Sequence, residues 1–199
     1  MKIVAALLCY LIGSIPTGYL VFRASGRGDI RAQGSGATGA TNVLRLRGWR
    51  AALPVALIDI AKGFVPSFII LRLFRDPVLA AGCASLAVLG HCFPVYIGFR
   101  GGKGVATAGG AMFAIAPLSA LASLGVFAAT VAVTRTVSLG SVLAVLLFPA
   151  FLAVFGTPVG VIAASVPILA LILVRHAGNI VRIFHGTERK LGAEEAKKA

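Results

Sequence analysis

Two glycine-rich stretches carry residue types that bind anions. The first spans residues 34–45, GSGATGATNVLR, and its polar side chains include Ser35, Thr41, Asn42 and Arg45. Glycines allow tight turns that point backbone N–H groups at an anion, hydroxyl and amide groups add hydrogen bonds, and an arginine can hold a phosphate with two parallel bonds. We therefore expect this stretch to bind an anionic ligand. The alternative is a flexible basic linker that anchors to anionic lipid.

The second stretch, GGKG at residues 101–104, leads directly into a predicted helix. The N-terminus of a helix attracts anions because its first N–H groups have no partner within the helix, and Lys103 adds a positive charge there. The stretch is not a nucleotide-binding P-loop, since Gly104 occupies the place where a Ser or Thr would hold magnesium. It predicts anion binding without nucleotide hydrolysis.

A third polar cluster, RHAGNIVRIFHGTER, covers residues 175–189. On a continuous helix His176 and Asn179 share one face, so both side chains can point into one site. Arg175 and Arg182 are expected nearer the lipid headgroups. The alternative, a basic helix end that snorkels to the membrane surface, explains the arginines but not the His–Asn pair.

The chain offers little acid–base machinery beside these clusters. It contains no paired carboxylates, no His-x4-Asp motif, no serine triad order and no metal-ligand cluster, so we expect neither a metal nor a cofactor. Asp59 and Lys62 lie three residues apart within an apolar segment, and a structural ion pair is the simplest interpretation. An enzyme built from these residues would bind anions well and would suit a substrate that arrives already activated.

The elements that position the clusters are apolar segments of membrane-spanning length. Of the 199 residues 58% are hydrophobic and only 13% are charged, which is typical of a polytopic membrane protein, and the net charge is +13. A nucleic-acid partner is not expected, because the cations lie between apolar segments and not on one basic domain. The composition predicts an all-α membrane helix bundle, and no obligate protein partner is inferred.

Charge placement fixes the predicted topology. Cations crowd the loop 23–50, the loop around Lys103 and the tail after Arg175, so the positive-inside rule places all three in the cytoplasm. That requires an even number of crossings between the last two, and Pro117 divides the long apolar segment 105–134 accordingly. About seven spans result, with the N-terminus outside and the C-terminus cytoplasmic. The predicted segments are 3–22, 51–74, 77–97, the two parts of 105–134, 137–155 and 158–175, in a single domain 1–190 followed by a disordered tail 191–199.

Four segments resemble a known family. GSIPTGYL (13–20), GSGATGATNVLR (34–45), GHCFPVYIGFRGGKGVAT (90–107) and RHAGNIVRIFHGTE (175–188) are similar to the signature segments of the bacterial acyl-phosphate:glycerol-3-phosphate acyltransferases. The resemblance covers nearly the whole chain, in the family's order. One departure is Ala37, where the family usually has Asn, so a role for that amide is in doubt here.

The resemblance implies an inner-membrane enzyme whose active site faces the cytoplasm. It would transfer a fatty acyl group from acyl phosphate to the sn-1 hydroxyl of glycerol 3-phosphate, giving lysophosphatidic acid and phosphate. Membrane lipid would surround the enzyme. From the residues and the resemblance together we expect four catalytic residues, Lys103, His176, Asn179 and Ser35. The general base is either His176 or the substrate's own phosphate, and we prefer the phosphate. The expected binding residues are Arg45, Thr41, Asn42, Thr107 and the backbone amides of Gly101, Gly102 and Gly104. A membrane transporter for an organic phosphate is the alternative, since glycines and intramembrane charges also suit a translocation path.

Overall fold

The computed structural model describes residues 1–26 and 28–192, and this part of the chain is helical. The predicted tail begins at residue 191. Residues 193–199 lie outside the described residues, whereas the Leu191 amide donates to the carbonyl of Arg135 over 2.8 Å. The helices are α1 (Lys2–Gly13), α2 (Thr17–Ala24), η1 (Ile30–Ala32), α3 (Ala40–Arg47), α4 (Trp49–Phe74), α5 (Pro77–Cys92), η2 (Val95–Ile97), α6 (Val105–Ile115), α7 (Pro117–Thr134), α8 (Val137–Val154), α9 (Val159–Arg175) and α10 (Ala177–Phe184).

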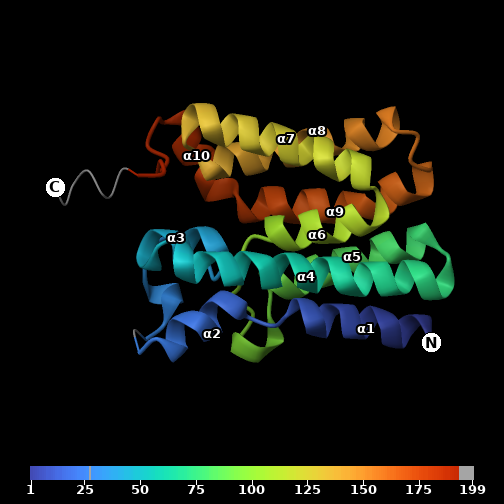
Figure 1. The fold of residues 1–199 in the computed structure, drawn as a ribbon, viewed down its shortest axis with the longest axis horizontal. Helices are drawn as coiled ribbons and strands as arrows, with labels where there is room; N and C mark the ends of the chain where they lie inside the picture. Colours follow the sequence, from blue (N-terminus) through green and yellow to red (C-terminus); the bar gives the residue numbers. More distant parts are fainter. Residues whose placement is uncertain (27, 193–199) are drawn as a thin grey trace.

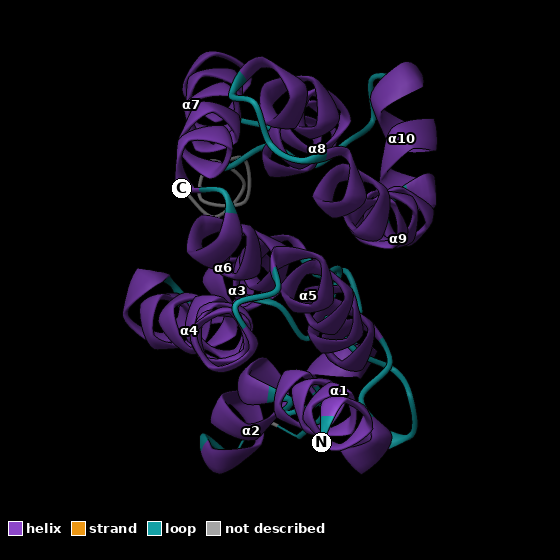
Figure 2. Cartoon of the chain, turned by 90° about the vertical axis from the view of Figure 1, so that its right-hand side faces the viewer, coloured by secondary structure: helices purple, strands orange, loops and turns teal. Residues whose placement is uncertain are grey.

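The long helices run roughly side by side along the longest axis of the molecule (Figure 1). Viewed from the end, α7 to α10 form one group and α1 to α5 another, with α6 between them (Figure 2). The short helices α3 and α10 lie at the end opposite the N-terminus, so the first and third polar clusters gather at one end of the bundle. This arrangement confirms the predicted all-α membrane bundle; which end faces the cytoplasm stays a prediction.

The first predicted span is broken, and the last one is followed by a sharp bend. The first is interrupted between α1 and α2, where Pro16 lacks the N–H that a continuous helix would need. The last apolar segment continues into α10 through a bend of 56° at His176. The expectation of one straight helix through His176 and Asn179 is therefore wrong: the two residues stand on either side of a turn, His176 before α10 and Asn179 within it.

The number of crossings depends on α6. Among the described residues five helical segments are long and apolar enough to cross a membrane, and the bent α9–α10 pair makes a sixth. Helix α6 has 11 residues and is thus about 16 Å long, roughly half of the hydrocarbon thickness of about 30 Å. Pro117 begins α7 as the sequence predicts. The predicted fourth span is therefore a half-length helix inside the bundle.

Helix α6 packs closely against α4 because small residues line their contact. A Cβ on Gly110 would lie 2.1 Å from the carbonyl oxygen of Ile60, and one on Gly63 would lie 1.9 Å from the carbonyl oxygen of Thr107. Only glycine lets two backbones approach this closely, as in the small-residue interfaces of membrane helices. This contact places the start of α6, immediately after Lys103, against the α4 wall.

Gly110→Ala is expected to destabilise the protein by about 1–3 kcal/mol or more, because the added methyl group meets backbone that cannot move aside. Gly109→Ala is the matched control, since a Cβ on this neighbouring residue has no atom within 4 Å. Thermal unfolding in one detergent compares the two variants. A Gly110→Ala protein as stable as Gly109→Ala would contradict the close α4–α6 packing.

Candidate active site

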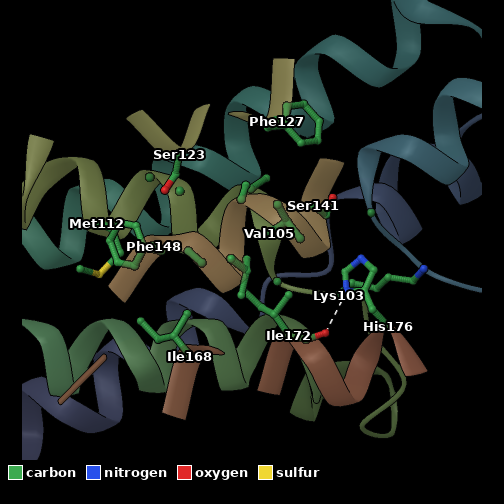
Figure 3. A pocket seen from close by; sticks show the side chains of 18 of the residues that line it. Lys103, Val105, Met112, Ser123, Phe127, Ser141, Phe148, Ile168, Ile172 and His176 are labelled. Atoms are coloured by element: carbon green, nitrogen blue, oxygen red, sulfur yellow. Dashed lines mark hydrogen bonds between the residues drawn. The ribbon is translucent and has the colours of Figure 1, made fainter. Parts of the chain in front are cut away.

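A cavity of about 510 Å³ joins the three polar clusters. At its polar end lie Lys103 and His176, and Met112 and Phe148 lie toward the other (Figure 3). The predicted site residues on its wall are Ser35, Thr41, Asn42, Arg45, Lys103, Gly104, His176 and Asn179. Segments more than 130 residues apart in sequence thus contribute to one wall.

The far part of the cavity is apolar and opens sideways. Its lining from α6, α8 and α9 is mainly aliphatic or aromatic, as at Met112 and Phe148. Three lining residues, Ile60, Phe113 and Leu124, are also 41%, 42% and 55% exposed. Val166 of α9, which also lines the cavity, is 51% exposed. The apolar part of the cavity therefore reaches the surface that lipid would cover.

A chain of polar contacts connects Lys103 to Glu188, in the segment that follows α10. The Lys103 ammonium donates to Asn179 Oδ1. Asn179 Nδ2 donates to Glu188 Oε1 over 2.7 Å, and Arg182 Nε donates to Glu188 Oε2 over 2.8 Å. Asn179 is thus oriented by Glu188, with its oxygen turned toward Lys103. This arrangement holds the lysine at the cavity wall.

Burial decides the charge state of Lys103. Loss of solvation is the largest influence and lowers its pKa to about 8, with Glu188 opposing and the nearby Arg182, Arg45 and Arg175 adding to the shift. Burial also raises the pKa of Glu188, but hydrogen bonds, including those from Asn179 and Arg182, outweigh it and leave the pKa below its ordinary value. Lys103 is therefore charged at neutral pH and loses its proton at a lower pH than an exposed lysine does.

The tautomer of His176 follows from its backbone contact. Its Nδ1 lies 2.8 Å from the carbonyl oxygen of Ile172, one turn earlier. A carbonyl oxygen can only accept, so Nδ1 carries the hydrogen and the neutral ring keeps a lone pair on Nε2. The ring is buried and lines the cavity. His176 can therefore accept a hydrogen bond or a proton through Nε2.

The Asn42 side chain forms its hydrogen bonds with the backbone of the first glycine-rich loop. Its Oδ1 accepts from the amide of Ser35 over 3.0 Å, and its Nδ2 donates to the carbonyls of Gln33 and Ala37. The amide is buried behind the loop, and a Cβ on Gly34 would collide with it at 2.2 Å. Asn42 therefore shapes the turn that presents Ser35, and its amide groups are already occupied by the loop.

The amides of Gly101 and Gly102 do not face the cavity as expected. Gly101 N donates to the carbonyl of Cys92, and Gly102 N donates to that of His91, both over 3.1 Å. Arg175 takes the opposite side of this loop, donating to the carbonyls of Gly102 (3.0 Å) and Gly101 (3.1 Å). These two glycines shape the loop and are not available as phosphate donors. Arg175 correspondingly clamps the loop instead of reaching for lipid headgroups.

The start of α6 is the part of this loop where backbone N–H groups stay candidates for binding an anion. Gly104 precedes the helix with a φ of 85°, a left-handed conformation that favours glycine, and it lines the cavity together with Val105 and Ala106. First-turn N–H groups have no partner inside their helix, so they can meet an anion beside Lys103. Thr107 lies one turn further, fully buried and away from the cavity lining, against α4.

The sequence analysis did not predict the contacts of Glu188 with Asn179 or of Arg175 with the loop 101–102. The chain turns back after α10 at Gly186, whose φ is 69°, and this returns Glu188 toward Asn179. A glycine just after an amphipathic helix is the one sequence signal for such a reversal. Nothing local indicates that Arg175 reaches back 73 residues to Gly102.

Comparison with known proteins follows this geometry. The family model for glycerol-3-phosphate acyltransferase matches residues 3–186. The chain belongs to the glycerol-3-phosphate acyltransferase family. This confirms the resemblance that the four sequence segments carry.

Relatives in this family match over nearly their full length. The glycerol-3-phosphate acyltransferase of Geobacter sulfurreducens is 43% identical over 194 residues, covering 96% of this chain and 98% of the relative. That of Symbiobacterium thermophilum is 44% identical over 195 residues, covering 98% and 96%.

Two crystal structures of the integral membrane glycerol 3-phosphate acyltransferase PlsY share the fold. The glycerol 3-phosphate form superposes with a TM-score of 0.92 at 39% identity, covering 98% of each chain. The lysophosphatidic acid form gives 0.89 at 38% identity, covering 100% of this chain and 99% of the other. The acyltransferase fold therefore extends from α1 to α10.

The affinity of the cavity for inorganic phosphate is expected to fall as the pH rises above about 8, where Lys103 loses its charge. The fall should approach about tenfold per pH unit once the lysine is mostly neutral. Titration calorimetry in detergent above neutral pH, where phosphate is already a dianion, measures it. Lys103→Met should bind weakly without this pH step, whereas Lys190→Met, at an exposed lysine, should behave as wild type. An affinity constant to high pH would remove Lys103 from the anion site.

Proposed function

We propose that this protein transfers a fatty acyl group from acyl phosphate to the sn-1 hydroxyl of glycerol 3-phosphate, giving lysophosphatidic acid and inorganic phosphate. The observation that carries the proposal is one cavity with a cationic end at Lys103 and an apolar end at Met112 and Phe148. Such a cavity suits molecules with a phosphate headgroup and an acyl chain. The related PlsY has been solved in a lysophosphatidic acid form, whose ligand has both parts, and in a glycerol 3-phosphate form, whose ligand has the phosphate without the acyl chain.

The cationic groups divide between two phosphates. Lys103 and the first-turn amides of α6 would hold one phosphate, and Arg45 and Ser35 on the facing loop would hold the other or share the first. Thr41, on the same wall, would hydrogen-bond the glycerol hydroxyls. Because loops carry these residues, the phosphates would bind at the level of the lipid headgroups. We place the site at the cytoplasmic face of the plasma membrane, as the basic loops predict.

Acyl phosphate as the donor explains the scarcity of acid–base groups. In this mixed anhydride the phosphate is a good leaving group, so positioning and charge stabilisation can supply much of the acceleration. The acceptor oxygen forms a bond to the acyl carbon, the bond from that carbon to the phosphate oxygen breaks, and the phosphate leaves with the electron pair. Lys103, charged below its pKa of about 8, stabilises the negative charge that develops.

The hydroxyl proton has two possible acceptors. The departing or bound phosphate can take it directly, or His176 can take it at Nε2, the nitrogen left free by the Nδ1 contact with Ile172. We favour the phosphate, because the donor brings this base into the site itself. His176 then serves to orient the acceptor hydroxyl through a hydrogen bond.

Donor choice is tested by phosphate release from the purified protein in lipid. Acyl phosphate should release phosphate only when glycerol 3-phosphate is present, with 1-acyl lysophosphatidic acid formed, and acyl-CoA should be inert. Product from acyl-CoA would overturn the donor assignment. No product from either donor with well-folded protein would overturn the enzyme proposal and favour transport, which uptake of labelled glycerol 3-phosphate into proteoliposomes would then measure.

Replacement of His176 separates the two proton acceptors. If the phosphate takes the proton, His176→Ala should retain kcat within roughly tenfold of wild type, since an essential general base contributes about 10²–10⁴. His185→Ala is the matched control: its Nδ1 also lies 2.8 Å from a carbonyl one turn earlier, that of Val181, but the ring is exposed. A kcat loss of three orders of magnitude in His176→Ala alone would make the histidine the base.

A further inference from the structure

A cluster of ionisable side chains is buried beneath the candidate site. Asp59 and Lys62 of α4 and His91 of α5 are only 1%, 6% and 5% exposed. Lys62 Nζ lies 2.8 Å from Asp59 Oδ1, and His91 Nδ1 lies 3.7 Å from the same oxygen. Asp59 and His91 also reach the cavity wall. The cluster therefore lies between the helix packing and the site.

On one side the cluster holds the break in the first span. Lys62 Nζ donates to the carbonyl of Ile15 over 2.9 Å, in the segment that joins α1 to α2. The same carbonyl accepts from the Thr17 amide over 3.0 Å, so Lys62 and the local turn together satisfy it at the break in the helix. Lys62 thus ties α4 to the segment before Pro16 while its charge is balanced by Asp59.

On the other side the cluster meets the loop that carries Lys103. The His91 ring lies flush against Gly102, since a Cβ there would be 2.0 Å from His91 Nε2. The carbonyl of His91 accepts the Gly102 amide over 3.1 Å. Arg175 holds the opposite side of the same loop through the Gly102 carbonyl. The loop is therefore gripped between His91 and Arg175, one residue before Lys103.

We propose that Asp59, Lys62 and His91 form a positioning device that fixes the glycine loop and, through it, the ammonium group of Lys103 at the cavity wall. These residues need not touch substrate. A buried ion pair adds little net stability compared with apolar residues of the same volume, so helix packing alone does not account for it. Charges within membrane segments are usually kept for function.

The cluster explains how a glycine-rich loop, which is flexible by composition, keeps one conformation. Lys62 pairs with Asp59 and donates to Ile15, and His91 packs beside the same carboxylate with Nδ1 3.7 Å from Asp59 Oδ1, so α4, α5 and the α1–α2 segment form one support under the loop. A shift of the His91 ring would leave Gly102 without its packing partner and would release Lys103 toward water. The effect on turnover rests on the proposed function; the effect on Lys103 itself does not.

The test measures Lys103 directly, by pH-dependent labelling of its amine in detergent-solubilised protein and mass spectrometry of the peptide. Wild-type labelling should be half-maximal near pH 8, reflecting burial among Glu188, Arg182, Arg45 and Arg175. His91→Ala should raise this apparent pKa by a unit or more and lower kcat/KM at least tenfold. His91→Phe, which keeps a ring against Gly102, should recover part of both.

Charge variants test the rest of the cluster. Lys62→Met leaves a buried carboxylate and is expected to unfold readily, so the double variant Asp59→Asn/Lys62→Met removes both charges together. It should fold, yet show the raised apparent pKa of Lys103 and a kcat/KM at least tenfold lower. Lys2→Met is the matched control, because that lysine pairs with Asp76 on the exposed surface over 3.4 Å.

The outcomes separate this inference from the proposed function. Folded variants with an unchanged Lys103 pKa would overturn the positioning role, whether or not activity falls. Activity that follows only the folded fraction would assign the cluster to stability. The variants could show the shifted Lys103 pKa while the wild-type protein makes no lysophosphatidic acid. That result would keep the positioning role and overturn the acyltransferase proposal.

Discussion

The clamp between Arg175 and the glycine loop connects the two halves of the molecule at the site. One guanidinium donates to the carbonyls of Gly101 and Gly102, and its carbon also lies 5.4 Å from the centre of the Phe93 ring. Arginine suits this position because its planar fork can meet two neighbouring carbonyls at once. Through this contact the last long helix fixes a loop between α5 and α6, and Lys103 is placed opposite Asn179 as a result.

The sequence indicated which residues would meet, because charge placement brings all three polar clusters to one membrane face. Ser35, Arg45, Lys103, His176 and Asn179 indeed line one cavity; their roles stay predictions. The use of each donor could not be predicted. Whether a glycine amide faces a ligand or a carbonyl depends on contacts such as that of Gly102 with His91, which no local pattern encodes.

The helical class and most span boundaries also follow from the sequence, since apolar length and Pro117 determine them. The bend at His176 does not, because the adjoining sequence contains no proline. It forms where His176 ends α9 and its ring bonds back to Ile172, while Asn179 is drawn toward Glu188. Long-range polar pairing, and not local propensity, therefore decides how the last span enters the site.

The cavity reaches the outer surface at its apolar part, and this affects how strictly the protein can select the length of a long ligand. A cavity closed on all sides would act as a ruler for an acyl chain, rejecting whatever exceeds its depth. Here Phe113 and Leu124 face both the cavity and the outer surface, so a chain that outgrows the interior continues into the bilayer, where extra methylene groups cost almost nothing. Discrimination would then rest on the carbons nearest the headgroup, and the acyl donors supplied to the protein, more than the depth of the cavity, would set the chain lengths incorporated.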